Sequence, residues 1–334
     1  MSKIKKIKKS VSKVPVRKSS NSPYFESLKR GDIIEIIAPG SYTSIEILNK
    51  GIEVLKNWGY GVICEENLLD PQVFLSNTDE KRFKSFKNAM TNKKSKAVWC
   101  LRGGYGSIRL LPLIEKMKIP NNKKILIGLS DISSLHVVLN QKWKVPSLHA
   151  SLLDRLALEK LSAENIHELR QVLENPDYVT VFDNLVPLNK PALVLKKIKA
   201  QVVGGNLMVV TSTLGTPSQI KTKNKILFLE ELCERSYRVD RCLHQMKQAG
   251  IFDEVCAVVF GDFIDCDEPN KENHIQVTLK EFFGKLKVPA FTGIEAGHGD
   301  RQRPLFFNTE THLTGGNKPQ MLVHSAFKKK VLSR

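Results

Sequence analysis

Apolar and polar positions alternate in blocks along the first half of the chain, and the period changes from one block to the next. Short apolar runs predict buried strands at Ile33–Ala38, Gly61–Cys64, Ala97–Leu101 and Lys124–Ile127. Helical spacing predicts helices between them, from Ile45 to Leu55 and over Asp79–Met90. Because strands that alternate with helices form a parallel sheet, the first half predicts a flavodoxin-like domain with helices on both faces.

The second half has more short apolar runs and fewer helical ones. Strands are expected at Ala192–Ile198, Lys199–Val203, Ile226–Glu230, Val255–Phe260, Val288–Thr292 and Met321–Ser325. Helices are expected at about Asn206–Leu214 and Val239–Ala249. This mixture predicts a second, β-rich α+β domain beside the parallel one, and the chain as a whole belongs to the α/β class.

Residues 156–190 separate the two patterns. They combine a charged helical stretch with the turn signal Asn175-Pro176-Asp177 and with Pro187, which together are typical of an interdomain linker. We therefore expect a first domain over residues 23–155 and a second over residues 191–330. A chain of 334 residues is long enough for each domain to bury its own core.

The net charge of +18 is concentrated at the two ends of the chain. The eight positive charges of residues 1–22 and the four of residues 327–334, with no acid among them, leave +6 for the body. Residues 1–22 are also rich in serine and lack aromatic residues, so we expect a disordered basic tail, where contact with nucleic acid or a membrane surface stays open. For the folded body we expect no membrane as partner, because no apolar run approaches the ~20 residues of a membrane span. We also expect no nucleic acid there, because most of the positive charge lies in the two ends of the chain.

Cysteine and histidine usage limits the chemistry. The six cysteines show no C-x-x-C spacing and several lie in apolar runs, so reduced thiols and a cytoplasmic location are expected. The tail also lacks the apolar stretch of a secretory signal. There is neither an H-E-x-x-H motif nor a Cys/His cluster, so the sequence predicts no metal and no other cofactor.

Two consecutive strand ends carry the candidate chemistry. Ile125–Ile132 predicts a strand that turns at Gly128, presents Ser130 and enters a helix, as in a nucleophile elbow, although the second glycine of G-x-S-x-G is absent. A serine that only caps the helix is the alternative. One strand earlier, Arg102–Gly106 has three glycines that allow backbone N–H groups to approach an anion, and a flexible turn or a phosphate-binding loop is the alternative there.

Together these segments, Arg102–Ser107 and Gly128–Asp131, resemble the LD-carboxypeptidases, the serine peptidases of the muramoyltetrapeptide carboxypeptidase and microcin-immunity group. The blocks that extend the resemblance are Ile37–Ser41, Gly204–Leu207, Ile226–Glu231, Tyr237–Arg241 and Gly297-His298. In this order the blocks cover roughly residues 31 to 308. The sequence departs from the family at Leu129, where an aromatic residue is usual, and after His298, where residues 299–308 lack the usual Leu-Pro-Leu-Gly ending.

The resemblance implies a catalytic triad with Ser130 as nucleophile, His298 as general base and Glu230 as the acid that orients the base. It places the oxyanion hole at the backbone N–H of Asp131 and that of Gly103 or Gly104, while the side chain of Asp131 is expected to cap the elbow helix. The rivals for these roles are His149 as base and Ser107, Ser133 and Ser134 as nucleophiles.

The implied function is hydrolysis of a murein tetrapeptide, between the meso-diaminopimelate centre and the terminal D-alanine, by a cytoplasmic homodimer. One alternative is an immunity-type peptidase that cleaves a peptidyl-nucleotide antibiotic. Recognition of a nucleobase favours an aromatic platform, and no tryptophan follows Trp143. The other alternative is a non-catalytic binding protein on the same fold, which the presence of Ser130, Glu230 and His298 disfavours.

Overall fold

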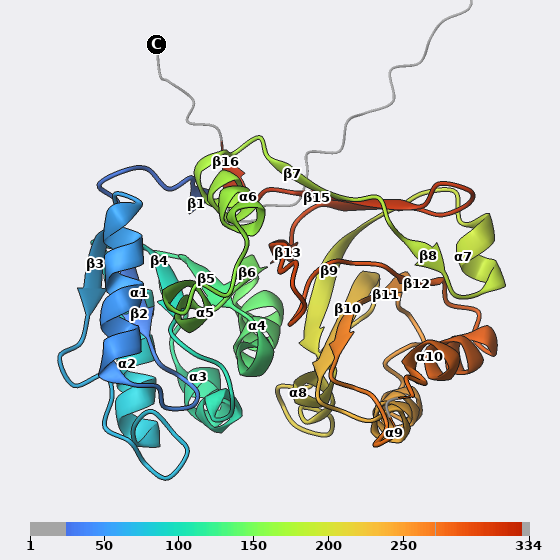
Figure 1. Cartoon of the computed structure of the whole chain (residues 1–334), viewed down its shortest axis with the longest axis horizontal. Coiled ribbons are helices and arrows are strands. Elements are labelled where there is room, and N and C mark those ends of the chain that lie inside the picture. Colours follow the sequence, from blue (N-terminus) through green and yellow to red (C-terminus); the bar gives the residue numbers. More distant parts are fainter. Residues whose placement is uncertain (1–24, 271, 329–334) are drawn as a thin grey trace, which may run out of the picture.

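Two β-sheets lie side by side, each with its own helices (Figure 1). The computed structural model describes residues 25–270 and 272–328, so the predicted basic tail of residues 1–22 lies outside the described residues. None of the helices in the described ranges has the length and hydropathy of a membrane span.

The first sheet has six strands in the order β13-β6-β5-β4-β2-β3. Their bounds are β2 Ile33–Ile37, β3 Gly61–Cys64, β4 Ser95–Cys100, β5 Ile125–Gly128, β6 Ser147–His149 and β13 Leu305–Phe307. The five strands from β2 to β6 are parallel, and their spatial order is the 2-1-3-4-5 order of flavodoxin-like sheets. β13, which comes from the far end of the chain, pairs antiparallel with β6.

Helices alternate with these strands as the polarity pattern predicts. They are α1 Ile45–Asn57, α2 Asp79–Thr91, α3 Leu111–Lys116, α4 Ser133–Val138, α5 Leu153–Ala157 and α6 Ala163–Glu174, with short turns η1 Ser107–Leu110, η2 Ser130–Ile132 and η3 Leu139–Trp143. α1 and α2 begin where the hydroxyl groups of Ser44 and Thr78 accept the first free N–H groups. The apolar face of each helix packs on the sheet, and Trp99 of β4 is fully buried.

The second sheet has eight strands in the order β7-β15-β14-β9-β10-β11-β12-β8. Their bounds are β7 Val179–Phe182, β8 Val186–Pro187, β9 Ile198–Asn206, β10 Lys225–Leu232, β11 Ala257–Ile264, β12 Ala290–Thr292, β14 Thr311–Thr314 and β15 Gln320–His324. β9 to β12 are parallel, and the strands on either side are antiparallel. The helices are α7 Lys190–Val194, α8 Leu207–Thr211, α9 Ser236–Gln248 and α10 Ile275–Gly284, and a small separate sheet pairs β1 Phe25–Glu26 with β16 Phe327–Lys328. The parallel first sheet and the β-rich second sheet confirm the predicted fold class.

The sequence did not predict β6, β7, β13 and β14, and two further segments differ from the sequence-based expectation. The strand predicted at Ala192–Ile198 is wrong, because the side chain of Asn189 accepts the N–H of Ala192 and Pro191 occupies the first turn, which together begin helix α7. Residues 156–190 contain α6, β7 and β8, and both strands belong to the second sheet. This segment therefore contributes to the folded body, while the domain boundaries stay a prediction.

Candidate active site

The turn after β5 holds Ser130 in a strained conformation. Leu129 is extended, and Ser130 has φ +66°, in the left-handed region that residues other than glycine rarely adopt. Gly128 precedes the turn because a Cβ there would lie 3.0 Å from Ile132 and 3.2 Å from Cys100. The strand, the sharp turn and the helical segment that follow one another here have the geometry of a nucleophile elbow, and such strain is common at active sites.

The glycine-rich loop after β4 lies directly against Ser130. A Cβ on Gly103 would be 3.0 Å from the Cβ of Ser130, and Gly104 has φ +80°. Within the described part of the chain, the structure shows no acceptor for the backbone N–H groups of Gly103, Gly104 and Asp131. N–H groups without an acceptor beside a serine hydroxyl are what an oxyanion hole requires.

The sequence predicts that the side chain of Asp131 caps the elbow helix. This prediction is wrong. Oδ2 of Asp131 instead accepts the N–H of Ser107 at 2.8 Å, at the start of η1, and the elbow segment η2 has no side-chain cap. Asp131 thus joins the turn that carries Ser130 to the glycine-rich loop. Its carboxylate has a structural partner and therefore supports the loop.

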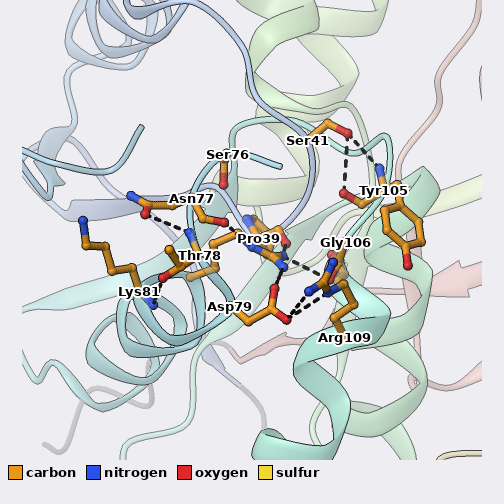
Figure 2. A network of polar contacts seen from close by, with 12 residues as sticks. Pro39, Ser41, Ser76, Asn77, Thr78, Asp79, Lys81, Tyr105, Gly106 and Arg109 are labelled. Atoms are coloured by element: carbon orange, nitrogen blue, oxygen red, sulfur yellow. Dashed lines mark hydrogen bonds and ion pairs between the residues drawn. The ribbon is translucent and has the colours of Figure 1, made fainter. Parts of the chain in front are cut away.

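A buried guanidinium holds this loop from the other side. Arg82 of α2 donates to the carbonyl groups of Pro39, Asn77 (3.1 Å) and Gly106 (3.0 Å), and pairs with Asp79. The second carboxylate oxygen of Asp79 binds Arg109 at 2.8 Å, and Figure 2 shows these two side chains facing each other. The network therefore connects α2 to the loops after β2 and β4. Sequence reasoning missed it, because nothing in an ordinary helix pattern distinguishes an arginine that points inward.

Arg82→Gln should lower the free energy of unfolding by about 3 kcal/mol, because it leaves buried carbonyl groups and one oxygen of Asp79 without their donor. Urea titration measures the loss. Arg82→Lys keeps the charge but has no planar fork of donors, so this variant should retain only part of the stability that Arg82→Gln loses. A loss below about 1 kcal/mol for Arg82→Gln would contradict the structural role that we assign to this network.

His298 and Glu230 form a direct, buried pair. His298 Nδ1 lies 2.6 Å from Glu230 Oε2, and their side chains are 9% and 0% exposed. Burial alone lowers the pKa of His298, but the charge of Glu230 and its hydrogen bond outweigh burial, so the net pKa is raised above the usual 6.5. The carboxylate also fixes the ring with Nδ1 toward Glu230, which leaves Nε2 for a reacting group.

The two glutamates of β10 occupy adjacent positions on the strand and make different contacts. The register between β10 and β11 shifts between Leu229 and Glu231, as in a β-bulge, and Glu230 lies at this irregularity. Glu231 does not contact His298; it accepts the side-chain N–H of Asn206 at 2.7 Å and the backbone N–H groups of Met208 and Leu232 at 2.8 Å each. Burial raises the pKa of Glu231 to about 7. Glu231 therefore secures the start of α8, and Glu230 is the glutamate in hydrogen-bond contact with His298.

Contacts between the two sheets bring the serine turn and the His–Glu pair toward each other. Ser133, three residues after Ser130, accepts the backbone N–H of Asn206 at 2.9 Å, and Asn206 is the register partner of Glu230. The hydroxyl of Ser130 itself makes no hydrogen bond within the residues that the structure describes. Catalytic hydrogen bonds are often loose without substrate, so this geometry leaves Ser130 available as a nucleophile.

The other candidates for the base and the nucleophile are all buried side chains. His149 is fully buried with its ring 5.1 Å from Phe228 and 5.4 Å from Phe307, and burial holds its pKa well below 6.5. The hydroxyl of Ser107 is buried without a partner, that of Ser133 is bound to Asn206, and that of Ser134 donates to the carbonyl of Asp131. None of them combines an accessible nucleophile or base with a catalytic partner.

Residues 299–308, which follow His298, are held in place by contacts of Arg303 and Gly299. The N–H of Arg303 closes the loop by donating to the carbonyl of Glu295 at 3.0 Å. Its guanidinium binds both oxygens of Glu168 on α6, at 2.8 and 2.7 Å, and lies over the ring of Phe182. This bidentate pair fixes the loop in place of the ending that the family usually has. Asp262 adds a second contact by accepting the N–H of Gly299 at 3.3 Å.

Comparison with known proteins places this arrangement in one family. Residues 34–150 match the LD-carboxypeptidase N-terminal domain, and residues 199–313 match the LD-carboxypeptidase C-terminal domain. A Rickettsia conorii protein that is provisionally named as a carboxypeptidase is 37% identical over 241 residues, which are 72% of this chain and 75% of the relative. The murein tetrapeptide carboxypeptidase of Pseudomonas aeruginosa is 27% identical, over 81% of this chain and 89% of the relative.

Solved structures agree with these matches. The muramoyltetrapeptide carboxypeptidase from Oxalobacter formigenes aligns with a TM-score of 0.76 at 26% identity, over 89% of this chain and all of that chain. The microcin C7 self-immunity protein MccF aligns with a TM-score of 0.79 at 19% identity, over 91% of this chain and 99% of that chain, which shows a shared fold. The fold, the site and these matches together define a carboxypeptidase. The chain belongs to the LD-carboxypeptidase family.

Proposed function

We propose that this protein is a serine peptidase that releases the terminal D-alanine from murein tetrapeptides by hydrolysing an L,D-amide bond. The observation that carries the proposal is the buried His298–Glu230 pair, since Asn206, the register partner of Glu230, contacts Ser133, three residues after the strained Ser130. Relatives named as murein tetrapeptide carboxypeptidases support the substrate class. By resemblance, the enzyme acts as a cytoplasmic homodimer in cell-wall recycling.

The proposed chemistry assigns one role to each residue. Ser130 Oγ attacks the carbonyl carbon of the scissile amide while His298 Nε2 takes its proton, since Nδ1 is bound to Glu230. The N–H of Asp131 and that of Gly103 or Gly104 stabilise the oxyanion. His298 then gives the proton to the leaving amine of D-alanine, and a water molecule activated by the same histidine hydrolyses the acyl-enzyme. No step in this sequence requires a cofactor.

The shared fold with MccF keeps a second substrate class open, a peptidyl-nucleotide whose amide bond is cleaved by the same triad. The absence of tryptophan after Trp143 disfavours it, because an indole ring is the strongest stacking platform for a nucleobase. A non-catalytic binding protein is disfavoured by a His–Glu pair that is buried and in hydrogen-bond contact.

The deciding experiment incubates the purified protein with a murein tetrapeptide and measures free D-alanine, with a peptidyl-nucleotide as the competing substrate. We expect D-alanine from the tetrapeptide and at least tenfold slower cleavage of the nucleotide. Faster cleavage of the nucleotide would support the immunity-type activity. Cleavage of neither substrate, with both bound, would support a binding protein.

The pH dependence gives an independent prediction about His298. Only the neutral imidazole accepts the serine proton, so kcat/KM should fall as the pH drops through the raised pKa of His298, above 6.5. In Glu230→Gln the charge that raises this pKa is lost while burial remains, so the acid limb should move to lower pH. Asp262→Asn is the matched control, because it removes a neighbouring carboxyl group but leaves Glu230. An acid limb that stays in place in Glu230→Gln would contradict the assignment of the base.

A further inference from the structure

Three potential metal ligands converge on one face of the hairpin formed by β14 and β15. Within residues 25–270 and 272–328, the ligand atoms of Glu310, His312 and His324 all lie within 4.8 Å of one another. The side chains are half-buried, with Glu310 and His312 34% and 23% exposed. No sequence motif predicts the group, because His324 on β15 follows His312 on β14 by 12 residues and Glu310 immediately precedes β14.

Strand geometry explains why these side chains meet. Glu310 immediately precedes β14 and lies two positions before His312, and their side chains are in contact, with Glu310 Oε1 3.1 Å from His312 Nε2. His312 pairs with Leu322 in the β14–β15 register, and the N–H of His324 donates to the carbonyl of Glu310 at 3.0 Å. Glu310 and His324 are therefore direct cross-strand neighbours, and His312 lies diagonally from His324, with the two rings 5.2 Å apart.

We propose that Glu310, His312 and His324 bind a divalent transition-metal ion of the zinc class. His312 Nε2 and Glu310 Oε1 are 3.1 Å apart, close to the roughly 3.3 Å between neighbouring ligand atoms on a tetrahedral zinc with bonds of about 2.0–2.1 Å. His324 Nε2 is buried and has no hydrogen-bond partner among the residues that the structure describes, so it is free to bind a metal. Two imidazoles and a carboxylate suit zinc better than calcium or magnesium, which prefer oxygen ligands alone.

The second carboxylate oxygen of Glu310 already has a partner, Lys199 Nζ at 2.6 Å. The ammonium group orients the carboxylate, and its charge also opposes a cation bound next to it. Lys199 stands near the start of β9, and Asn206, the register partner of Glu230, ends the same strand. Seven residues of strand separate them by roughly 23 Å, so the proposed metal is remote from His298 and would clamp the hairpin rather than take part in the peptidase reaction.

Equilibrium dialysis of the full-length, chelator-treated protein against micromolar zinc tests the proposal. We expect wild type to retain one zinc equivalent more than His312→Ala or His324→Ala. Zinc should also raise the melting temperature of wild type but not that of either variant. His274→Ala is the matched control, since His274 also pairs with a glutamate, Glu272, but has no second histidine. Equal zinc retention by wild type, His312→Ala and His324→Ala would overturn the proposal.

Two further measurements identify the ligands. Cobalt-substituted wild type should show the visible bands of a four-coordinate ion without a sulfur-to-metal band, whereas a sulfur band would assign the metal to an exposed thiol such as Cys233 and overturn the site. Lys199→Met removes the competing charge and should bind zinc several-fold more tightly. Equal or weaker binding by this variant would contradict ligation through Glu310.

Discussion

Ser130→Ala should reduce kcat/KM for the tetrapeptide by about 10⁴-fold or more, the scale seen when a catalytic serine is removed from a triad. The loss is large because the oxygen that forms the acyl-enzyme is gone, while substrate binding by the remaining site persists. The fold should be retained, since the hydroxyl of Ser130 makes no hydrogen bond among the described residues. D-Alanine release under single-turnover conditions measures the change directly.

Ser107→Ala is the control for this variant. Its hydroxyl is buried at the start of η1 and has no hydrogen-bond partner within residues 25–270 and 272–328, so its removal should leave turnover within about threefold of wild type. If Ser130→Ala keeps more than a tenth of the activity while Ser107→Ala loses it, the nucleophile has been assigned to the wrong loop. Circular dichroism of both variants separates such a result from a loss of folding.

Glu230→Gln should lower kcat by roughly 10²–10⁴-fold with a much smaller effect on KM. A glutamine keeps the shape of the side chain, but its amide can donate to Nδ1 and so stabilise the tautomer in which Nε2 carries the proton. The charge that stabilises the imidazolium is also lost, and both effects act on the transition state. Steady-state kinetics with the tetrapeptide separate kcat from KM.

Glu231→Gln provides the matched comparison, because it makes the same chemical change one residue along the strand. Glu231 accepts three N–H groups, and an amide has one acceptor oxygen for them. We therefore expect a stability loss of about 1–3 kcal/mol with turnover nearly retained. Comparable losses of turnover in the two variants, or a larger loss in Glu231→Gln, would mean that the wrong glutamate orients His298.

Four strands of the first sheet, β2 to β5, could be predicted, because their short apolar runs alternate with helical spacing and each signal is local, whereas the three-residue strand β6 was missed. The error at Ala192–Ile198 has a local cause as well: the apolar side chains favour a strand, and the helix start set by Asn189 and Pro191 outweighs them. The placement of β13 in the first sheet could not be predicted, because its partner β6 lies more than 150 residues earlier in the chain.

In the candidate site too, local features could be predicted from the sequence, and contacts between residues far apart in the chain could not. The turn at Ser130 and the glycine loop could be found from the residues, since strand, glycine and serine follow one another directly. The pairing of Glu230 with His298 came only from the family resemblance, because 68 residues separate them. The supporting contacts of Arg82 and Arg303 were missed, since a buried arginine looks like a surface arginine until its partners are in place.

The segment that carries His298 bridges the two sheets, because it leaves β12 in the second sheet and enters β13 in the first. The proposed base is thus held on a segment whose two ends pair in different sheets. The main apolar core contains buried residues of both sheets, such as Val98 and Phe228, so a movement of one sheet against the other shifts this segment and its imidazole. Mild denaturant should then abolish activity at concentrations where circular dichroism still shows folded protein. Neither half expressed alone should form an active site.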